Sequence, residues 1–294
     1  GKYADERTMT MGENSAIEWT DHTWNPWIGC TRVSQGCVNC YAEALAKRYG
    51  KAEWGPTAQR VRTSEANWRK PLQWNRKAEK DGVRRRVFCA SLADIFEDND
   101  QLTGWRKDAF NVMARAPWLD WLLLTKRPEN ILDMVPDEWR TVGRWPRNVW
   151  MGTTIENQSV VINRLSELIR VPAPVRFLSC EPLLGPLDLS EWLDFIGWVI
   201  VGGESGQDAR GPMHPDWPRS LLHQCQEANV PFLFKQWGQF VPVGQTDRTW
   251  YNSGQMMYAA DKATAVQAIR LKSKHDAGRQ LDGREWNEFP EVTL

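Results

Sequence analysis

The stretch VFCASLADIFEDNDQLTGWRKDAFNVMARAPWLDWLLLTKRP, residues 87–128, decides the fold class. It holds a short apolar run at 87–92, a segment at 105–117 with apolar residues at helical spacing, and a second apolar run at 121–128. Short apolar runs predict buried strands, and the periodic segment predicts an amphipathic helix. A strand–helix–strand order predicts parallel strands joined by a right-handed crossover.

The same alternation continues along the chain. Further strands are predicted at 148–157, 175–184, 197–205 and 231–238, with helices at 159–169 and 216–229 and a short one from 129. With one more strand expected before residue 30, the chain has roughly seven units, which favours a (β/α) barrel over a flat sheet. We therefore predict an α/β fold built on a parallel (β/α) barrel, partial or complete.

Three regions are expected along the 294 residues: an N-terminal tail at 1–16, the barrel at 17–240 and a C-terminal cap at 241–294. The barrel region includes a cysteine-rich loop at 29–41 and a basic insertion at 51–86, which carries Trp54, Trp68 and Trp74 among arginines and lysines. Basic side chains beside aromatic rings suit phosphate contact and base stacking. The alternative, which the sequence favours, is a solvated helical insertion whose tryptophans pack on the barrel.

Composition limits the classes of partner. The 37 basic and 37 acidic side chains balance, so no global field draws the chain to nucleic acid or to a membrane. No apolar run approaches the ~20 residues that span a bilayer. The tail lacks the apolar segment of a signal peptide. We expect a cytoplasmic protein without a membrane partner, in which most of the 18 tryptophans belong to the core.

Polar side chains follow six of the predicted strands at the point where each strand ends. In parallel α/β folds the active site gathers at these carboxyl ends. The site candidates are Ser91, Asp94, Lys126, Arg127, Thr154, Glu156, Glu181 and Glu204, and Lys235 and Gln236 end the sixth strand.

Three cysteines, Cys30, Cys37 and Cys40, fall within the eleven residues before a predicted helix. In a reducing compartment, clustered thiols are more often metal ligands or catalytic groups than disulfides. A zinc site would need a fourth ligand such as His22, and a redox C-x-x-C pair would leave Cys30 unexplained. An iron–sulfur cluster held by three thiolates would keep one iron open to another ligand.

Seven motifs together resemble the radical S-adenosylmethionine (SAM) superfamily, and most closely a phage- and prophage-associated three-cysteine family of unassigned general activity. They are IEWTDHTWNPWIGC, CVNCY, LLLTKRP, GTTIEN, FLSCEPLLGP, GGESG and PFLFKQWG. The resemblance runs from about residue 17 to residue 290 and implies a radical-SAM-like barrel. The spacing here, C-x6-C-x2-C, is wider than the superfamily's usual C-x3-C-x2-C.

The resemblance implies that Cys30, Cys37 and Cys40 hold a [4Fe–4S] cluster whose open iron binds SAM. One electron, from a donor such as flavodoxin or ferredoxin, would cleave SAM and form a 5′-deoxyadenosyl radical that abstracts hydrogen from the substrate.

The strand-end candidates receive roles from the chemistry of SAM. Ser91 and Asp94 suit its ammonium group, and Lys126 or Arg127 its carboxylate. Thr154, Glu156 and Glu181 are candidates for ribose or substrate. Glu204 is a candidate ligand contact or acid/base group, so that Glu181 and Glu204 are the catalytic candidates.

The tryptophan- and arginine-rich insertion and the phage association of the resembling family favour a nucleobase or nucleoside substrate. An aminoacyl-modified thymine in phage DNA is the specific hypothesis, with isomerisation or base modification as the reaction. The alternative is a non-catalytic zinc-binding module whose tryptophan-rich face binds a protein or nucleic-acid partner.

Overall fold

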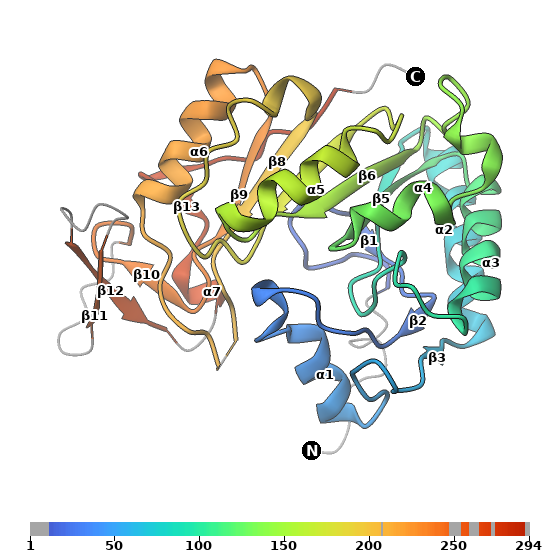
Figure 1. Cartoon of the computed structure of the whole chain (residues 1–294), viewed down its shortest axis with the longest axis horizontal. Helices are drawn as coiled ribbons and strands as arrows, with labels where there is room; N and C mark the ends of the chain where they lie inside the picture. Colours follow the sequence, from blue (N-terminus) through green and yellow to red (C-terminus); the bar gives the residue numbers. More distant parts are fainter. Residues whose placement is uncertain (1–11, 207, 247–253, 259–264, 272–273, 292–294) are drawn as a thin grey trace. The chain divides into compact units, whose positions relative to one another are not determined.

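The strands of the main sheet are apolar runs that are buried along most of their length. The computed structural model describes residues 12–206, 208–246, 254–258, 265–271 and 274–291 (Figure 1). The helices and strands of the first half are β1 (His22–Thr23), β2 (Trp27–Ile28), η2 (Gln35–Cys37), α1 (Tyr41–Tyr49), β3 (Val61–Arg62), α2 (Glu65–Asp81), β4 (Arg85–Cys89), α3 (Leu102–Ala114), β5 (Leu119–Thr125), η3 (Pro128–Asn130), α4 (Ile131–Met134) and η4 (Asp137–Arg140). Those of the second half are β6 (Val149–Thr154), η5 (Gln158–Val160), α5 (Val161–Leu168), β7 (Arg176–Cys180), η6 (Leu193–Phe195), β8 (Trp198–Gly202), α6 (Asp216–Glu227), β9 (Phe232–Gln236), β10 (Phe240–Pro242), β11 (Gly254–Tyr258), β12 (Ala265–Arg270), α7 (Lys274–Ala277), β13 (Gln280–Leu281) and β14 (Arg284–Glu285).

Seven strands form one sheet in the order β1-β4-β5-β6-β7-β8-β9, with parallel registers. This order does not close on itself among the described strands. The prediction of a parallel β/α fold is therefore confirmed in its partial-barrel form.

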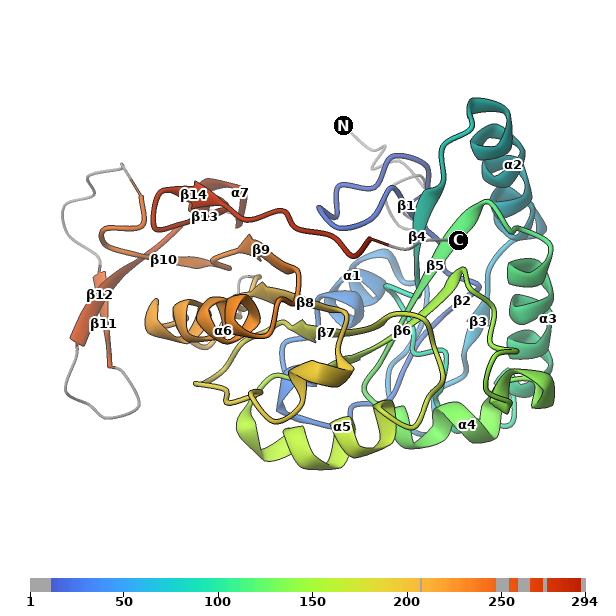
Figure 2. The same ribbon diagram turned by 90° about the horizontal axis from the view of Figure 1, so that it is seen from above.

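The chain divides into two compact units, residues 1–153 with 167–175, and residues 154–166 with 176–293. In the first unit α2 packs against β4 and β5. In the second, α6 lies beside β9 in both views (Figures 1 and 2). The predicted boundaries at residues 16 and 240 remain predictions.

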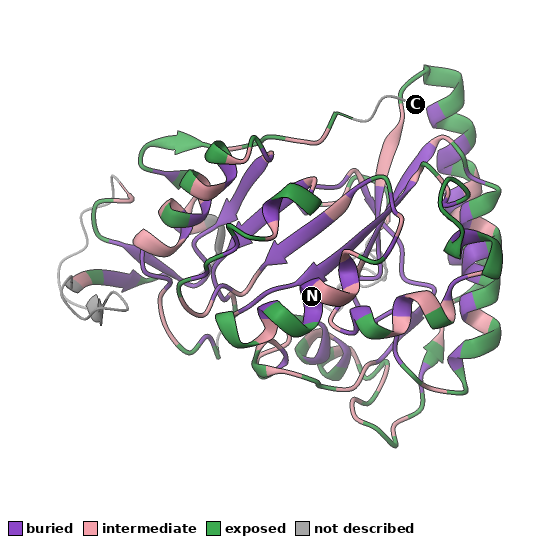
Figure 3. Cartoon of the chain, turned by 45° about the horizontal axis from the view of Figure 1, so that its top comes forward, coloured by how far each residue is buried: buried purple, intermediate pink, exposed green. Residues whose placement is uncertain are grey.

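The burial pattern explains why the strands could be read from the sequence. Every residue of β6, β8 and β9 is buried, while helix surfaces alternate between buried and exposed (Figure 3). Parallel strands covered on both faces read as continuous apolar runs. Each observed strand ends before its predicted run does because the polar residues that follow it leave the sheet, and β4 and β5 begin two residues earlier than predicted.

The predicted helix at 216–229 ends slightly early. Helix α6 stops at Glu227, and Asn229 takes φ 55°, the left-handed conformation that ends many helices.

About half of the insertion at 51–86 is the helix α2, which begins after Ser64. The Ser64 hydroxyl accepts a hydrogen bond from the Asn67 backbone N–H and caps the helix. Trp68 and Trp74 of this helix are 6% and 5% exposed. Trp68 packs edge-on against Trp24, and Trp74 stacks on His22. These two rings belong to the core of the first unit.

The C-terminal region adds small antiparallel sheets to the second unit. Strands β10, β12 and β11 form one of them in that order, and β13 pairs with β14. Residues 247–253, 259–264, 272–273 and 292–294 of the predicted cap lie outside the described residues. Among the described helices, none has the length and apolar character to cross a bilayer.

Candidate functional site

The cysteine loop runs from Gly29 to Cys40 in the first unit. All three cysteines are free thiols, and Cys40 is the N-cap residue of α1. The Gly29 N–H donates to the Leu92 carbonyl at 3.0 Å, which holds the loop beside the carboxyl end of β4. In the part of the chain that the structure describes, no three His, Cys, Asp or Glu side chains are grouped as a metal site. The loop thus carries three thiols that are not assembled as a ligand set.

Arg127 connects the cysteine loop to the end of β5. Its Nη1 donates to Cys30 Sγ at 3.7 Å and to Asp94 Oδ2 at 2.9 Å, and its Nη2 donates to the Thr31 carbonyl at 2.7 Å. Arg127 and Asp94 are both buried. Three predicted site residues from distant parts of the sequence, Cys30, Asp94 and Arg127, therefore lie in one hydrogen-bonded cluster.

Asp94 is fully engaged by its neighbours. Oδ1 accepts hydrogen bonds from the Phe96 N–H (3.0 Å) and the Thr125 hydroxyl (2.7 Å). Oδ2 accepts from the Lys126 N–H (3.1 Å) as well as from Arg127. A carboxylate offers about four lone-pair sites, and all are used here. Asp94 therefore fixes Arg127 and the turn after β5.

The charges of this cluster set the protonation of Cys30. Burial raises the pKa of the Cys30 thiol to about 12, and Asp94 acts in the same direction, whereas Arg127 opposes both. Burial by itself lowers the pKa of Arg127, but Asp94 and Cys30 outweigh it, so the net shift is upward. Cys30 is accordingly a neutral thiol at pH 7 in the metal-free chain.

We expect Asp94→Asn and Arg127→Gln to change Cys30 reactivity in opposite directions. Removing the carboxylate lowers the pKa of Cys30 and speeds its alkylation several-fold, while removing the guanidinium raises that pKa and slows it. Mass-spectrometric rates of iodoacetamide labelling between pH 7 and pH 10 measure both. Shifts of the same sign in the two variants would contradict this electrostatic account.

Cys30 also contributes to the pH dependence of stability. Because its pKa in the folded chain is raised, the stability it contributes is present below its ordinary pKa and is lost as the pH rises toward about 12.

A buried ion pair between Arg60 and Glu97 lies next to Arg127. Arg60 Nε and Nη2 donate to Glu97 Oε2 and Oε1 at 2.8 and 2.7 Å, with side chains 0% and 3% exposed. Glu97 Oε1 also lies 3.8 Å from Arg127 Nη2. Reasoning from the sequence missed this pair, because no local pattern connects two residues that are 37 positions apart.

Ser91 lies at the end of β4 and is held from two sides. Asn25 Nδ2 donates to Ser91 Oγ at 3.0 Å, and the Tyr41 hydroxyl donates to the Ser91 carbonyl at 2.8 Å. Since Tyr41 follows Cys40 directly, this bond ties the last cysteine of the loop to β4. In the sequence, Asn25 could be noticed only as a polar residue between the two tryptophans of TWNPW.

In the second unit, Glu156 is fully buried and paired with Arg164 of α5. Arg164 Nη1 donates to Glu156 Oε2 and to the Thr154 carbonyl, both at 2.6 Å. Arg164 comes eight residues after Glu156 and lies on α5, which follows β6 in the chain. Arg164 thus connects Glu156 with Thr154, and its positive charge balances that of the Glu156 carboxylate.

Glu181 follows β7 and contacts the end of β9. Lys235 Nζ lies 2.7 Å from both carboxylate oxygens, and Gln236 Nε2 donates to Oε1 at 3.1 Å. The sequence shows Lys235 and Gln236 as polar residues after an apolar run, but nothing in it pairs them with Glu181.

Glu204 pairs with Arg210. The Arg210 backbone N–H donates to Oε2 at 2.6 Å, and Nη2 donates to Oε1 at 2.7 Å. Next to it, two segments of backbone cross closely. A Cβ on Gly203 would lie 2.0 Å from the Trp237 carbonyl oxygen, and one on Gly238 would lie 2.3 Å from the Glu204 carbonyl oxygen. This crossing explains why glycine stands in both GGESG and QWG.

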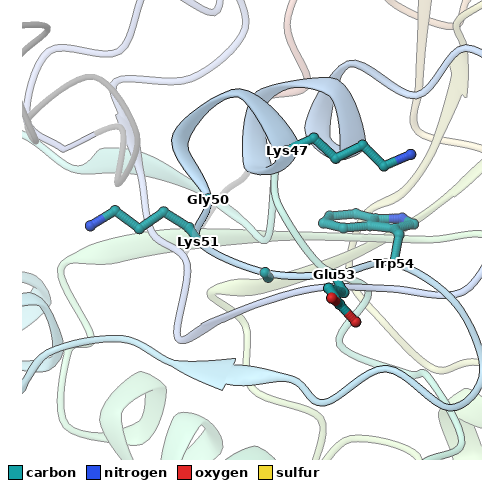
Figure 4. A pocket seen from close by; sticks show the side chains of 6 residues that line it. Lys47, Gly50, Lys51, Glu53 and Trp54 are labelled. Carbon is teal, nitrogen blue, oxygen red and sulfur yellow. The ribbon is translucent and has the colours of Figure 1, made fainter.

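A surface pocket of about 680 Å³ opens beside the C-terminal end of α1. Lys47, Lys51, Glu53 and Trp54 contribute side chains to its lining (Figure 4). Trp54 is half-buried and packs on the same core cluster as Cys40. The neighbouring Gly55 N–H donates to the Cys30 carbonyl at 3.1 Å. The segment that lines the pocket is thus hydrogen-bonded to the cysteine loop.

His22, the candidate fourth zinc ligand, has other contacts. Its Nδ1 accepts from the Asn14 N–H at 3.3 Å, and its ring stacks on Trp74. Cys89, Cys180 and Cys225 are fully buried free thiols whose pKa values are raised by burial.

Comparisons with known proteins add a family and one structural likeness. A solved structure of a mutant spore photoproduct lyase with bound AdoMet and dinucleoside spore photoproduct superposes with a TM-score of 0.47 and 11% identity, covering 91% of this chain and 73% of that chain. No curated protein sequence matches at a significant level. The family model described as "Protein of unknown function (DUF5131)" matches residues 14–290. The chain therefore belongs to the DUF5131 family.

Proposed function

We propose that this chain is a radical SAM enzyme whose cluster is held by Cys30, Cys37 and Cys40. The observation that carries the proposal is the contact of Arg127 with Cys30, at the carboxyl ends of β4 and β5. The first cysteine of a three-thiol loop lies where parallel α/β folds place their active sites.

The donor set fits a [4Fe–4S] cluster in its chemistry. Cysteine thiolates are the usual ligands of such clusters, and three of them leave one iron for SAM. Cys40 at the start of α1 places a thiolate near helix N–H groups, which favour negative charge. Because the thiols are not grouped in the described chain, cluster binding requires residues 30–40 to draw them together. The bound cluster would supply the electron that cleaves SAM.

The strand-end residues divide into positioning groups and ligand candidates. Asp94 uses all its acceptor sites within the protein, so we reassign it from holding the SAM ammonium to orienting Arg127. Arg127 donates toward Cys30 and would offset the negative charge of its thiolate when the cluster is bound. Ser91 and the Lys126 side chain remain candidates for SAM, and Thr154 and Glu156 for ribose or substrate. Glu181 and Glu204 remain the catalytic candidates.

We propose a nucleobase or nucleoside-type substrate, with an aminoacyl-modified thymine in phage DNA as the specific case and isomerisation or base modification as the reaction. The pocket at Trp54 supports contact with single-stranded nucleic acid. An aromatic ring beside two lysines suits base stacking and phosphate pairing. A cytoplasmic location and a flavodoxin or ferredoxin donor remain predictions.

Trp54→Ala is expected to weaken single-stranded DNA binding by a factor of about 5–150, as loss of one base stack costs about 1–3 kcal/mol. Lys51→Ala should reduce the salt slope by about one, and Lys107→Ala, on the exposed face of α3, serves as the control. Fluorescence anisotropy across a salt series measures both. Absent or salt-independent binding would exclude the DNA polymer as substrate.

Anaerobic reconstitution with iron and sulfide tests the cluster. We expect a brown protein with about four irons per chain in the wild type, and loss of that iron in the single alanine variants of Cys30, Cys37 and Cys40. Cys225→Ala, a buried cysteine of α6, is the matched control and should retain the iron. A colourless protein that holds about one zinc would support the interaction module instead.

A further inference from the structure

Glu181, Lys235 and Gln236 form a polar cluster in the second unit that is more than an ion pair. Glu181 stands directly after β7, and the other two residues end β9. The Glu181 and Lys235 side chains are 18% and 11% exposed, while Gln236 is 2% exposed. The cluster thus combines partly accessible charges with a buried amide.

Gln236 leaves an acceptor unused. Its Nε2 donates to Glu181 Oε1 at 3.1 Å and to the Gly203 carbonyl at 3.0 Å. These two acceptors fix the amide orientation, since a flipped amide would set its oxygen against both of them. Gln236 Oε1 is then buried with no hydrogen-bond partner among the described residues. A buried acceptor without a donor is costly, and such groups in native proteins generally meet a ligand or water.

The charges in the cluster compensate each other. Lys235 directs two contacts to the Glu181 carboxylate, which leaves one of its three N–H donors unused by the contacts within the described chain. A phosphate would have to compete with Glu181 for Lys235, and an ammonium group would have to compete with Lys235 for Glu181. The group that this arrangement favours is therefore neutral and polar.

The Glu181 and Gln236 side chains lie close to the backbone of Gly202. A Cβ on Gly202 would lie 3.2 Å from Glu181 Cδ and 3.4 Å from Gln236 Nε2. Glycine at this position lets the carboxylate and the amide approach the end of β8.

We infer that Glu181, Lys235 and Gln236 form a subsite for a neutral group that carries both an N–H donor and a carbonyl acceptor, as the imide edge of a pyrimidine base does. Gln236 Oε1 accepts the ligand N–H, and Lys235 donates to the ligand carbonyl. Glu181 also holds Lys235 and the Gln236 amide in place. This inference deepens the proposed function and rests on it for the choice of a nucleoside as ligand.

Calorimetric titration of the full-length chain with thymidine tests the subsite. We expect Gln236→Met and Lys235→Met to bind thymidine at least about tenfold more weakly, because a site built for hydrogen bonds rejects a partner that leaves them unmade. Glu227→Gln, on the exposed end of α6, is the control and should bind as the wild type does. Unchanged thymidine binding by a folded Gln236→Met variant would overturn the inference, as would a wild type that does not bind thymidine.

A comparison of two ligands on the wild-type protein tests the inference even if the variants do not fold. N3-methylthymidine lacks the imide N–H, so the wild-type protein should bind it at least about tenfold more weakly than thymidine, and equal affinity would overturn the inference. Inorganic phosphate should not compete with thymidine. A protein that assembles its cluster but does not bind thymidine would refute this subsite and leave the proposed radical SAM function standing. Thymidine binding that depends on Gln236, in a protein that takes up no iron, would refute the proposed function alone.

Discussion

Replacing Glu97 with alanine is expected to lower the free energy of unfolding by about 3–5 kcal/mol. The substitution leaves the Arg60 guanidinium buried without its bidentate carboxylate and removes a carboxylate 3.8 Å from Arg127. An uncompensated buried charge is among the most destabilising changes that a single substitution can make. Urea unfolding followed by circular dichroism gives the difference.

Glu13→Ala is the matched control for Glu97→Ala. Glu13 pairs with Lys77 at 2.9 Å, but both side chains are largely exposed. Loss of an exposed pair costs about 0–1 kcal/mol. If the two variants lost similar amounts of stability, burial of the Arg60–Glu97 pair would not have the stabilising effect that we expect.

Gly203→Ala is expected to cost more than about 4 kcal/mol, or to prevent folding of the second unit. Its Cβ would meet the Trp237 carbonyl oxygen at 2.0 Å, a backbone atom that can move only if β9 moves with it. Thermal unfolding and the yield of folded protein report the loss.

Gly185→Ala separates the steric effect from the general cost of replacing glycine. No heavy atom lies within 4 Å of the position that its Cβ would take. We expect its stability to stay within about 1 kcal/mol of the wild type. A Gly203→Ala protein as stable as Gly185→Ala would show that the two backbone segments do not cross as described.

The strands could be predicted because the physics that forms them is local. WLLLTKRP and GWVIVGGES are continuous apolar runs, which is what a parallel strand covered on both faces requires. The short β1 was expected only from the count of units, since two residues carry no periodic signal. The sequence marks residues 51–86 as a basic, tryptophan-bearing insertion and offers a helix as one interpretation. The direction in which Trp68 and Trp74 point depends on the Trp24 and His22 rings that they meet.

The candidate site was predictable as a set of positions and not as a set of contacts. Polar residues after each strand identified Asp94, Arg127 and Glu181. Which of them neutralise each other depends on pairings between segments far apart in the chain, such as that of Lys235 with Glu181. Glu97 carries no local signal, because a buried carboxylate and an exposed one look the same in a sequence. Gln236 could be recognised as a strand-end residue, but its contacts with Glu181 and Gly203 could not.

The central claim is that three cysteines of one loop hold a cluster that cleaves SAM. Anaerobic incubation of the reconstituted protein with SAM and dithionite, followed by chromatography of the nucleosides, tests it most directly. The wild type should form 5′-deoxyadenosine and Cys30→Ala should form none. A wild-type protein that keeps its bound metal yet leaves SAM intact would contradict the account.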